Sequence, residues 1–161
     1  MTPPSITISP AAESDIPTIL GLIRELADYE KLSHLVVATP DSLRRDLFGQ
    51  RPHAEVLIAR LDAKAMGYAL FFHSYSTFLG KPGIYLEDVY VTPAARGQGI
   101  GKALLRAVAR VALDRKCGRL EWSVLNWNTP AIEFYQSLGA RALDEWTLYR
   151  MDESAIAKLA Q

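Results

Sequence analysis

The sequence has very little cysteine and no excess of either charge sign. Cys117 is its single cysteine, so no intramolecular disulfide can form, which fits a reducing compartment. The 18 Lys and Arg residues balance the 18 Asp and Glu residues, giving a net charge of zero. A nucleic-acid binder normally carries surplus positive charge against phosphate. We therefore expect a cytoplasmic protein without a nucleic-acid partner.

Long apolar runs and metal-binding patterns are also missing. No stretch approaches the roughly 18 apolar residues of a membrane span, and Met1–Ser5 lacks the basic-then-apolar pattern of a signal peptide. His34, His53 and His73 have neither an i, i+4 histidine partner nor a cysteine partner. These absences predict no membrane association and no metal site.

The composition that remains is typical of one folded domain. Apolar residues make up 49% of the 161 residues and charged residues 22%, enough to bury a sizeable core. The chain contains no internal repeat, low-complexity tract or linker-like stretch. We expect a single domain over residues 1–161.

Periodicity and turn residues predict a mixed α/β fold. Apolar spacing and helix-start signals predict four helices, which begin near Ser14, Thr39, Ile100 and Thr129. Gly118 suits a left-handed end to the third helix, and Gly139 ends the fourth. The predicted strands lie near Ile6–Ile8, Glu55–Arg60, Met66–Ser74, Ile84–Val91, Arg119–Leu125 and Glu145–Met151, with a hairpin turn at Asp62-Ala63-Lys64.

The glycine-rich turn Arg96–Gly101 is the most informative segment. It connects a predicted strand to an amphipathic helix, where unpaired amide groups and the helix dipole favour an anion. A Walker loop would need Gly at 96 and Ser or Thr at 103, but the sequence has Arg96 and Ala103. A dinucleotide fingerprint starting at Gly97 would need a glycine where Lys102 stands. Both alternatives are excluded, and the pattern Arg-x-x-Gly-x-Gly remains.

Two further segments make this pattern specific. Tyr85–Val91 (YLEDVYV) precedes the glycine turn, and Asn126–Tyr135 (NWNTPAIEFY) follows the next strand. With Leu26–Glu30 (LADYE), they resemble the spermidine/spermine acetyltransferase branch of the GNAT N-acetyltransferase superfamily, which includes diamine and thialysine acetyltransferases. The resemblance runs from about Ile6 to Met151. It implies a mixed, V-split central sheet of about six to seven strands flanked by about four helices, and a homodimer.

The resemblance also implies a binding site for acetyl-CoA. The cofactor enters where the strand of Glu87–Val91 separates from that of Arg119–Leu125, its pantetheine arm against the first strand. Amides of the glycine turn hold the pyrophosphate, and residues from the later helix line the far side. The implied cofactor-binding residues are Val89, Tyr90, Val91, Arg96, Gly97, Gln98, Gly99, Ile100, Gly101, Lys102, Asn128, Ala131 and Tyr135.

Acetyl transfer to an amine requires a base, a polarised carbonyl and an acid for the leaving thiolate. The resemblance assigns Glu87 either as the base or as a substrate anchor, and the two roles stay open. It assigns Tyr135 as the acid, since a phenol with an ordinary pKa of about 10 suits a coenzyme A thiolate. A strand amide near Val89 would polarise the carbonyl.

The acceptor implied by the resemblance is a small cationic amine. Its implied binding residues are Tyr29, Glu30, Glu87, Asp88, Glu121, Trp122, Ser123 and Glu145. Glu121 and Glu145 are equally explained as surface charges, and Trp122 as a core residue. Asn126 and Thr129 are uncharged where polyamine-acetylating relatives tend to carry acids, so thialysine, lysine or a diamine competes with a polyamine as the acceptor.

Two other functions remain open at this point. Acetylation of a protein lysine or N-terminus uses the same chemistry on a larger substrate. A non-catalytic acetyl-CoA sensor would need the glycine turn but not an acid, so the presence of both Glu87 and Tyr135 favours an enzyme.

Overall fold

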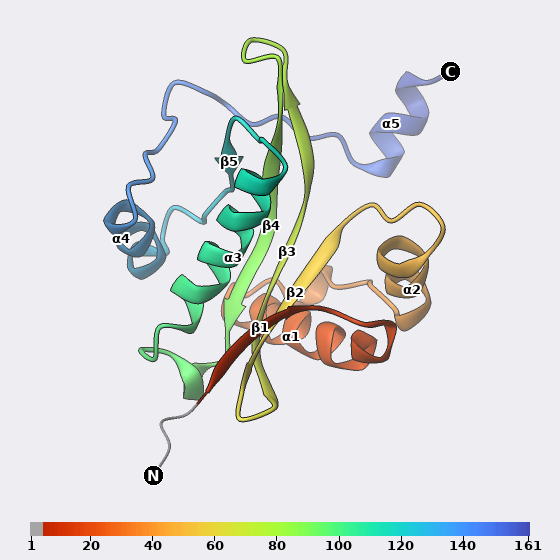
Figure 1. The fold of residues 1–161 in the computed structure, drawn as a ribbon. Coiled ribbons are helices and arrows are strands. Elements are labelled where there is room, and N and C mark those ends of the chain that lie inside the picture. Colours follow the sequence, from red (N-terminus) through yellow and green to blue (C-terminus); the bar gives the residue numbers. More distant parts are fainter. Residues whose placement is uncertain (1–4) are drawn as a thin grey trace. The chain divides into compact units, whose positions relative to one another are not determined.

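The computed structural model describes residues 5–161. These residues form two compact units, the first ending at Ser123 and the second beginning at Val124. Residues 1–4 lie outside the described residues. They belong to the segment Met1–Ser5, for which the sequence predicts no signal peptide. The first unit contains β1 (Ile6–Pro10), η1 (Glu13–Asp15), α1 (Ile16–Tyr29), η2 (Ser33–Leu35), α2 (Pro40–Phe48), β2 (Glu55–Leu61), β3 (Lys64–Ser76), β4 (Lys81–Val91), η3 (Pro93–Ala95), α3 (Ile100–Asp114) and β5 (Leu120–Glu121) (Figure 1). The second contains α4 (Thr129–Ser137) and α5 (Glu153–Leu159).

A five-stranded mixed sheet organises the first unit. The strand order is β1-β2-β3-β4-β5, with antiparallel pairing from β1 to β4 and parallel pairing between β4 and β5. Asp62 and Ala63 have φ angles of 49° and 68° in the tight turn between β2 and β3, which confirms the predicted hairpin. The mixed α/β fold is therefore confirmed, although the described residues form five strands instead of six to seven.

Helices α1 and α3 cover opposite faces of this sheet. Tyr68 and Ile58 pack with α1 residues such as Ile19, and all three are fully buried. A Cβ on the neighbouring Gly67 would lie 3.4 Å from Leu104 of α3. Because successive strand residues point to opposite faces, Gly67 and Tyr68 face different helices. Figure 1 shows α3 lying along the strands.

The start of α1 differs from the predicted cap at Ser14. Ser14 lies inside η1, and Asp15 occupies the N-cap position. The Asp15 carboxylate accepts a hydrogen bond from the Ala12 amide at 2.9 Å and forms an ion pair with Arg60 at 2.7 Å. The short 3-10 turn therefore delays the helix by one residue and ties its start to β2.

The sequence predicts the start of α3 correctly but not the left-handed residue after its end. Gly99 is the N-cap with a φ of 81°, at the predicted glycine turn. The left-handed residue after the helix is Lys116, with a φ of 57°, and not Gly118 as predicted. A Cβ at Gly118 would lie 3.0 Å from the Leu79 side chain. Gly118 therefore serves a close approach to the β3–β4 hairpin and not a helix cap.

The pairing of β4 with β5 is very short. Only Ile84 with Leu120 and Tyr85 with Glu121 are in register, whereas β4 continues to Val91. The predicted strand Arg119–Leu125 is thus reduced to two residues. Beyond Tyr85 the ladder between the two strands ends, which confirms the predicted split in the sheet.

The second unit carries helices and no strand within its described residues. Helix α4 begins at Thr129-Pro130 as predicted, and Gly139 follows its end with a φ of 90°. The predicted strand Glu145–Met151 is wrong, because this exposed segment has no strand partner in the described sheet. Helix α5 was not predicted, although Asp152 caps it by accepting from the Ala155 amide at 2.8 Å. The described residues therefore form five α-helices instead of four.

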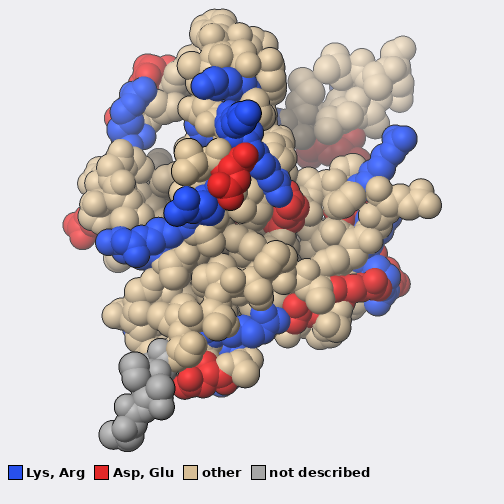
Figure 2. Space-filling view, in the orientation of Figure 1, with Lys and Arg blue, Asp and Glu red and all other residues tan. Residues whose placement is uncertain are grey.

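Charged side chains of both signs are interspersed on the face shown in Figure 2. Surface ion pairs within the first unit include Arg44 with Glu13 at 2.9 Å and Arg45 with Asp46 at 2.7 Å. Exposed pairs of this kind are screened by solvent and contribute little to the stability of a fold.

Candidate active site

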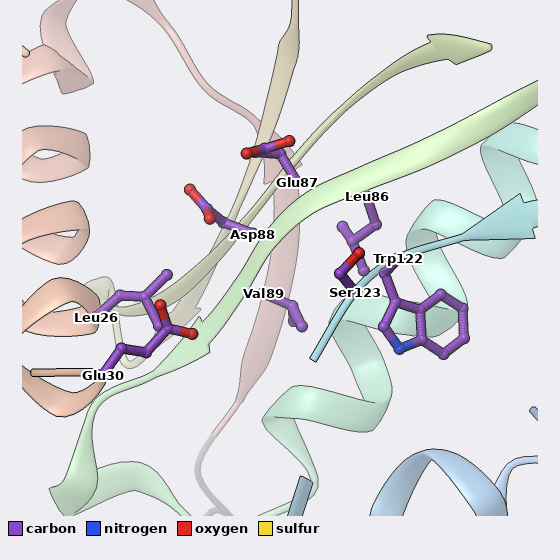
Figure 3. A pocket seen from close by; sticks show the side chains of 8 residues that line it. All are labelled: Leu26, Glu30, Leu86, Glu87, Asp88, Val89, Trp122 and Ser123. Carbon is purple, nitrogen blue, oxygen red and sulfur yellow. The ribbon is translucent and has the colours of Figure 1, made fainter. Parts of the chain in front are cut away.

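A β-bulge places two consecutive carboxylates beside the same pocket. Leu70 is in register with Asp88, and Phe71 with Leu86, so Glu87 is the extra residue on β4. A bulge interrupts the strict alternation of strand side chains and redirects the residues within it. The Asp88 side chain points toward α1, and the Glu87 side chain projects from β4 next to that of Asp88 (Figure 3).

The pocket lies between the C-terminal end of α1, β4 and the segment after β5. It is lined by Leu26, Glu30, Leu86, Glu87, Asp88, Val89, Trp122 and Ser123. Five of these residues were predicted to bind the acceptor, namely Glu30, Glu87, Asp88, Trp122 and Ser123. Three of the five are acidic, and none of the eight lining residues carries a positive charge. The pocket is therefore suited to a cationic group.

Asp88 has the most perturbed environment in this pocket. Its Oδ2 atom accepts a hydrogen bond from the Tyr68 hydroxyl at 2.9 Å. Burial is the main cause that raises the pKa of Asp88 to about 6, with smaller contributions from Glu87 and Glu30, and the Tyr68 hydrogen bond opposes the rise. Asp88 therefore holds its proton to a higher pH than an ordinary aspartate does.

Glu30 and Tyr29 lie at the C-terminal end of α1. Burial raises the pKa of the Glu30 carboxyl above its usual range. The Arg96 guanidinium carbon lies 4.8 Å from the centre of the Tyr29 ring and 5.7 Å from that of Tyr90. The Arg96 Nε also donates a hydrogen bond to the Val91 carbonyl at 3.1 Å. Arg96, predicted to bind the cofactor, is thus held against a predicted acceptor-site residue.

The glycine turn has the geometry of an anion site. Gly97 and Gly99 have φ angles of 76° and 81°, and an added Cβ at either would meet no atom within 4 Å. Positive φ favours glycine, and the open space leaves the backbone accessible to a bulky ligand. Helix α3 begins at Ile100, and the amide groups of its first turn lack intrahelical acceptors. These features fit the predicted pyrophosphate group, with Lys102 exposed next to the turn.

The free stretch of β4 lies between this turn and the acidic pocket. Val89, Tyr90 and Val91 belong to the part of β4 beyond its pairing with β5. Tyr90 is buried and donates from its hydroxyl to Glu25 at 3.3 Å, so its side chain belongs to the core. An extended ligand arm can still hydrogen-bond to the strand backbone, as an added strand would.

Residues near β5 do not all belong to the pocket. The Glu121 carboxylate pairs with Arg119 at 2.9 Å and is not among the pocket-lining residues. The Ser123 hydroxyl lies 2.9 Å from the Tyr85 hydroxyl, which links β4 to the chain after β5. Of the three predicted residues in this segment, Trp122 and Ser123 lie at the pocket, whereas Glu121 does not.

Four predicted site residues belong to the second unit. Asn128 is buried and caps α4 by accepting from the Ala131 amide at 3.4 Å. Tyr135 is half-buried on the same helix, with its ring 5.7 Å from that of Phe134. Glu145 lies in the exposed segment before α5. The acid role of Tyr135, the cofactor role of Asn128 and Ala131, and the acceptor role of Glu145 stay predictions.

Sequence reasoning missed Tyr68 and the apolar pocket residues Leu26 and Leu86. The contact of Tyr68 with Asp88 depends on the register of β3 on β4, because Tyr68 is directly opposite Tyr90 and reaches Asp88 diagonally. The only sequence signal for the bulge is the pair of adjacent acids within an otherwise apolar strand.

Two other kinds of feature are absent from residues 5–161. No group of three or more His, Cys, Asp and Glu side chains in this part of the chain is arranged to hold a metal ion. None of its helices is both long and apolar enough to cross a bilayer.

Comparison with known proteins places the chain in one family. The Acetyltransferase (GNAT) family model matches residues 23–140. The chain is 43% identical to thialysine N-epsilon-acetyltransferase of Bos taurus, over 96% of this chain and 97% of that protein. It is 34% identical to spermidine/spermine N(1)-acetyltransferase-like protein 1 of Homo sapiens, over 93% of this chain and 23% of that longer protein. An integron cassette protein from V. cholerae has a similar structure, with a TM-score of 0.81, 27% identity and 98% of each chain covered.

The split mixed sheet and the glycine turn at the start of α3 define an N-acetyltransferase fold. The chain belongs to the Acetyltransferase (GNAT) family. It is an acetyltransferase, and the predicted resemblance to the spermidine/spermine and thialysine branch is confirmed.

Proposed function

We propose that the protein transfers the acetyl group of acetyl-CoA to a primary amine of a small cationic acceptor, in a complex that holds both substrates. The observation that carries this proposal is the acidic pocket formed by Glu30, Glu87 and Asp88 at the unpaired edge of β4. A pocket with three carboxylates and no cation favours an ammonium group over a neutral or anionic acceptor.

The names of similar proteins narrow the acceptor class. Relatives that are 43% and 34% identical are named for thialysine and for spermidine and spermine. Glu121 is paired with Arg119 instead of lining the pocket, which reduces the acidic surface available to a long polyamine. We therefore place thialysine, lysine or a short diamine ahead of spermine.

The chain's own residues supply the proposed chemistry as follows. The ammonium group of the acceptor loses a proton to Glu87, directly or through water, before its nitrogen attacks the thioester carbonyl carbon. A backbone amide near Val89 donates to the carbonyl oxygen as negative charge develops there. The carbon–sulfur bond then breaks, and the Tyr135 hydroxyl gives its proton to the departing thiolate. The attacking nitrogen loses its second proton to the resulting phenolate, directly or through water, which leaves a neutral amide, coenzyme A and the restored Tyr135 phenol.

The cofactor would lie along the features already described. The amides of Gly97 to Lys102 would hold the pyrophosphate, since they form a helix start with accessible glycines. Val89 to Val91 would pair with the pantetheine arm, and Asn128 and Ala131 would line its other side. Acetyl-CoA supplies the activated acetyl group when bound. We further propose one catalytic domain that includes both compact units, acting in a cytoplasmic homodimer.

Release of coenzyme A from acetyl-CoA, followed with a thiol reagent, tests the proposal. The acceptor panel is thialysine, lysine, putrescine, spermidine, spermine and a lysine-containing peptide. We expect turnover with at least one small amine and a kcat reduced by about 10²-fold or more in Tyr135→Phe. Tyr149→Phe is the matched control, because Tyr149 is 89% exposed in the same unit, and its kcat should equal that of the wild type.

Other results would redirect the assignment. Turnover with the peptide alone would indicate a protein acetyltransferase. Tight coenzyme A binding without turnover on any amine would indicate a sensor. An unchanged kcat in Tyr135→Phe would contradict the role of Tyr135 as the acid while leaving the amine reaction in place.

A further inference from the structure

Tyr68 makes a buried polar contact that the proposed mechanism does not use. It lies in the middle of β3, is fully buried and packs in the core between the sheet and α1. Its hydroxyl donates to Asp88 Oδ2 at 2.9 Å. Tyrosine is an unusual choice for a fully buried core position, because its hydroxyl must find a partner there. The partner here is one of the three pocket carboxylates.

The electrostatic surroundings of Asp88 explain what this contact does. The charged groups that face it are Glu30 from α1 and Glu87 from β4, and both are acidic. Trp122 and Ser123, from the chain after β5, carry no charge. Burial and both acids favour the neutral form of the Asp88 carboxyl, so they raise its pKa, whereas the Tyr68 hydrogen bond lowers it. The Tyr68 hydrogen bond thus favours the ionised form of Asp88, and it adds no positive charge to the pocket.

We propose that Tyr68 is a positioning residue for the acceptor site, whose phenol fixes the Asp88 carboxylate at the pocket and keeps it as the anion that receives the ammonium group. This inference rests on the proposed amine acetylation. It assigns the binding of the cation to Asp88 and the removal of a proton to Glu87. Because Tyr68 donates one neutral hydrogen bond, the remaining lone pairs of Asp88 stay available to the acceptor.

A positively charged residue in place of Tyr68 would not keep the negative charge of Asp88 available to the amine. An arginine or lysine would hold Asp88 ionised but would also cancel the charge that attracts the amine. A phenylalanine would preserve the packing and lose only the hydroxyl. The expected consequence of that loss is an Asp88 that becomes protonated at higher pH, and therefore a weaker acceptor site at mildly acidic pH.

The kinetic test compares Tyr68→Phe with the wild type over pH 5 to 9. We expect the acidic limb of kcat/KM for the amine to move upward by about one pH unit, because a hydrogen bond to a charged group has roughly that effect. At pH 6 the KM for the amine should rise several-fold, whereas at pH 8.5 it should approach that of the wild type. The KM for acetyl-CoA should not change. Tyr75→Phe is the matched control on the same strand, because Tyr75 is 63% exposed.

A second measurement does not depend on turnover. The carboxyl carbons of ¹³C-labelled aspartate are titrated by NMR in the wild type, Tyr68→Phe and Asp88→Asn, the last of which identifies the Asp88 signal. An upward displacement of the Asp88 titration in Tyr68→Phe supports the inference. An unmoved titration, or a KM that rises equally at all pH values, overturns it and leaves Tyr68 as a packing residue.

The two proposals fail separately. If the wild type acetylates no amine, the proposed function fails, and the NMR titration still decides whether Tyr68 controls the ionisation of Asp88. If the amine reaction proceeds with an identical pH profile in Tyr68→Phe, only the role of Tyr68 fails. A thermal melt of each variant at pH 8 checks that the changes do not come from unfolding.

Discussion

Arg96, at the start of the glycine turn, stacks on Tyr29, at the end of α1, with 4.8 Å between the guanidinium carbon and the ring centre. This contact joins the segment proposed to hold the cofactor to the segment proposed to receive the acceptor. Arg96 is further fixed by its hydrogen bond to the Val91 carbonyl. Its side chain therefore links the two proposed sites, even though the sequence pattern assigns it to one.

Replacing Arg96 should affect both substrates. In Arg96→Gln we expect the KM values for acetyl-CoA and for the amine each to rise by about 3- to 10-fold, since the exposed cation–π contact contributes about 0.5–1 kcal/mol and the positive charge near the phosphate is also lost. Lys102→Gln is the matched control and should raise only the KM for acetyl-CoA. An unchanged KM for the amine in Arg96→Gln would show that the stacking on Tyr29 has no influence on the acceptor.

Gly99 should not tolerate a side chain, for a reason of backbone conformation alone. Its φ of 81° is strained for an L residue, while the space around an added Cβ is open. Gly99→Ala should lower the free energy of unfolding by about 1–2 kcal/mol and weaken coenzyme A binding.

Gly21 provides the opposite control for this prediction. It lies inside α1, and its added Cβ also meets no atom within 4 Å, without a positive φ. Gly21→Ala should stabilise the fold by about 0.5–1 kcal/mol in urea unfolding. Destabilisation by both substitutions would mean that occupied space, and not φ, limits these sites.

Asp15 should make stability depend on pH. The amide of Ala12, followed by Arg60, holds the pKa of the Asp15 carboxyl below its usual range. Because the folded pKa is lower than the unfolded one, this stabilisation is present above about pH 4 and is lost as pH falls further. Asp15→Asn should be less stable than the wild type by about 1 kcal/mol at pH 7.

The difference between Asp15→Asn and the wild type should shrink as the pH is lowered toward 3, when measured by urea unfolding at several pH values. Asp41→Asn is a useful comparison, because the Asp41 side chain is 94% exposed and its pair with Arg44 lies at the surface. A constant difference for Asp15→Asn at all pH values would argue against an electrostatic origin.

Asp88 should make the stability of the fold depend on pH in the opposite direction to Asp15. Burial raises its pKa to about 6, above the unfolded value, so the charged form destabilises the fold as pH rises from about 4 toward 6. Asp88→Asn should therefore be more stable than the wild type at pH 7, by an amount on the order of 1–3 kcal/mol, while the KM for the amine rises at least 10-fold. A less stable Asp88→Asn would mean that the carboxylate is compensated in the folded protein.

The features that the sequence predicts well are those determined by local patterns. The apolar spacing of α1 and the proline and glycine signals of α2, α3 and α4 place these helices correctly, because each depends on neighbours within a few residues. The glycine turn is predictable for the same reason. Its strand-turn-helix setting is visible in the chain, and the family motifs on both sides make it specific.

The features that depend on pairing could not be predicted in this way. Glu145–Met151 has strand-like residues, but a strand forms only where a partner is available. The register of β3 on β4 determines that Tyr68 reaches Asp88, and no local pattern gives that register. Gly118 has the residue type of a helix cap, yet the side chain of Leu79, distant in sequence, is the reason for a glycine there.

The bulge on β4 determines which strand pairs would remain if Glu87 were deleted. If Glu87 were deleted, Leu86 would still face α3 and Asp88 would still face α1, because these two residues already alternate as neighbours in a regular ladder would. The sheet therefore does not need Glu87. The residue that the chemistry is proposed to depend on is therefore the one that these strand pairs do not use, so a chain without it would retain the pairs and Asp88 and lose the proposed proton acceptor.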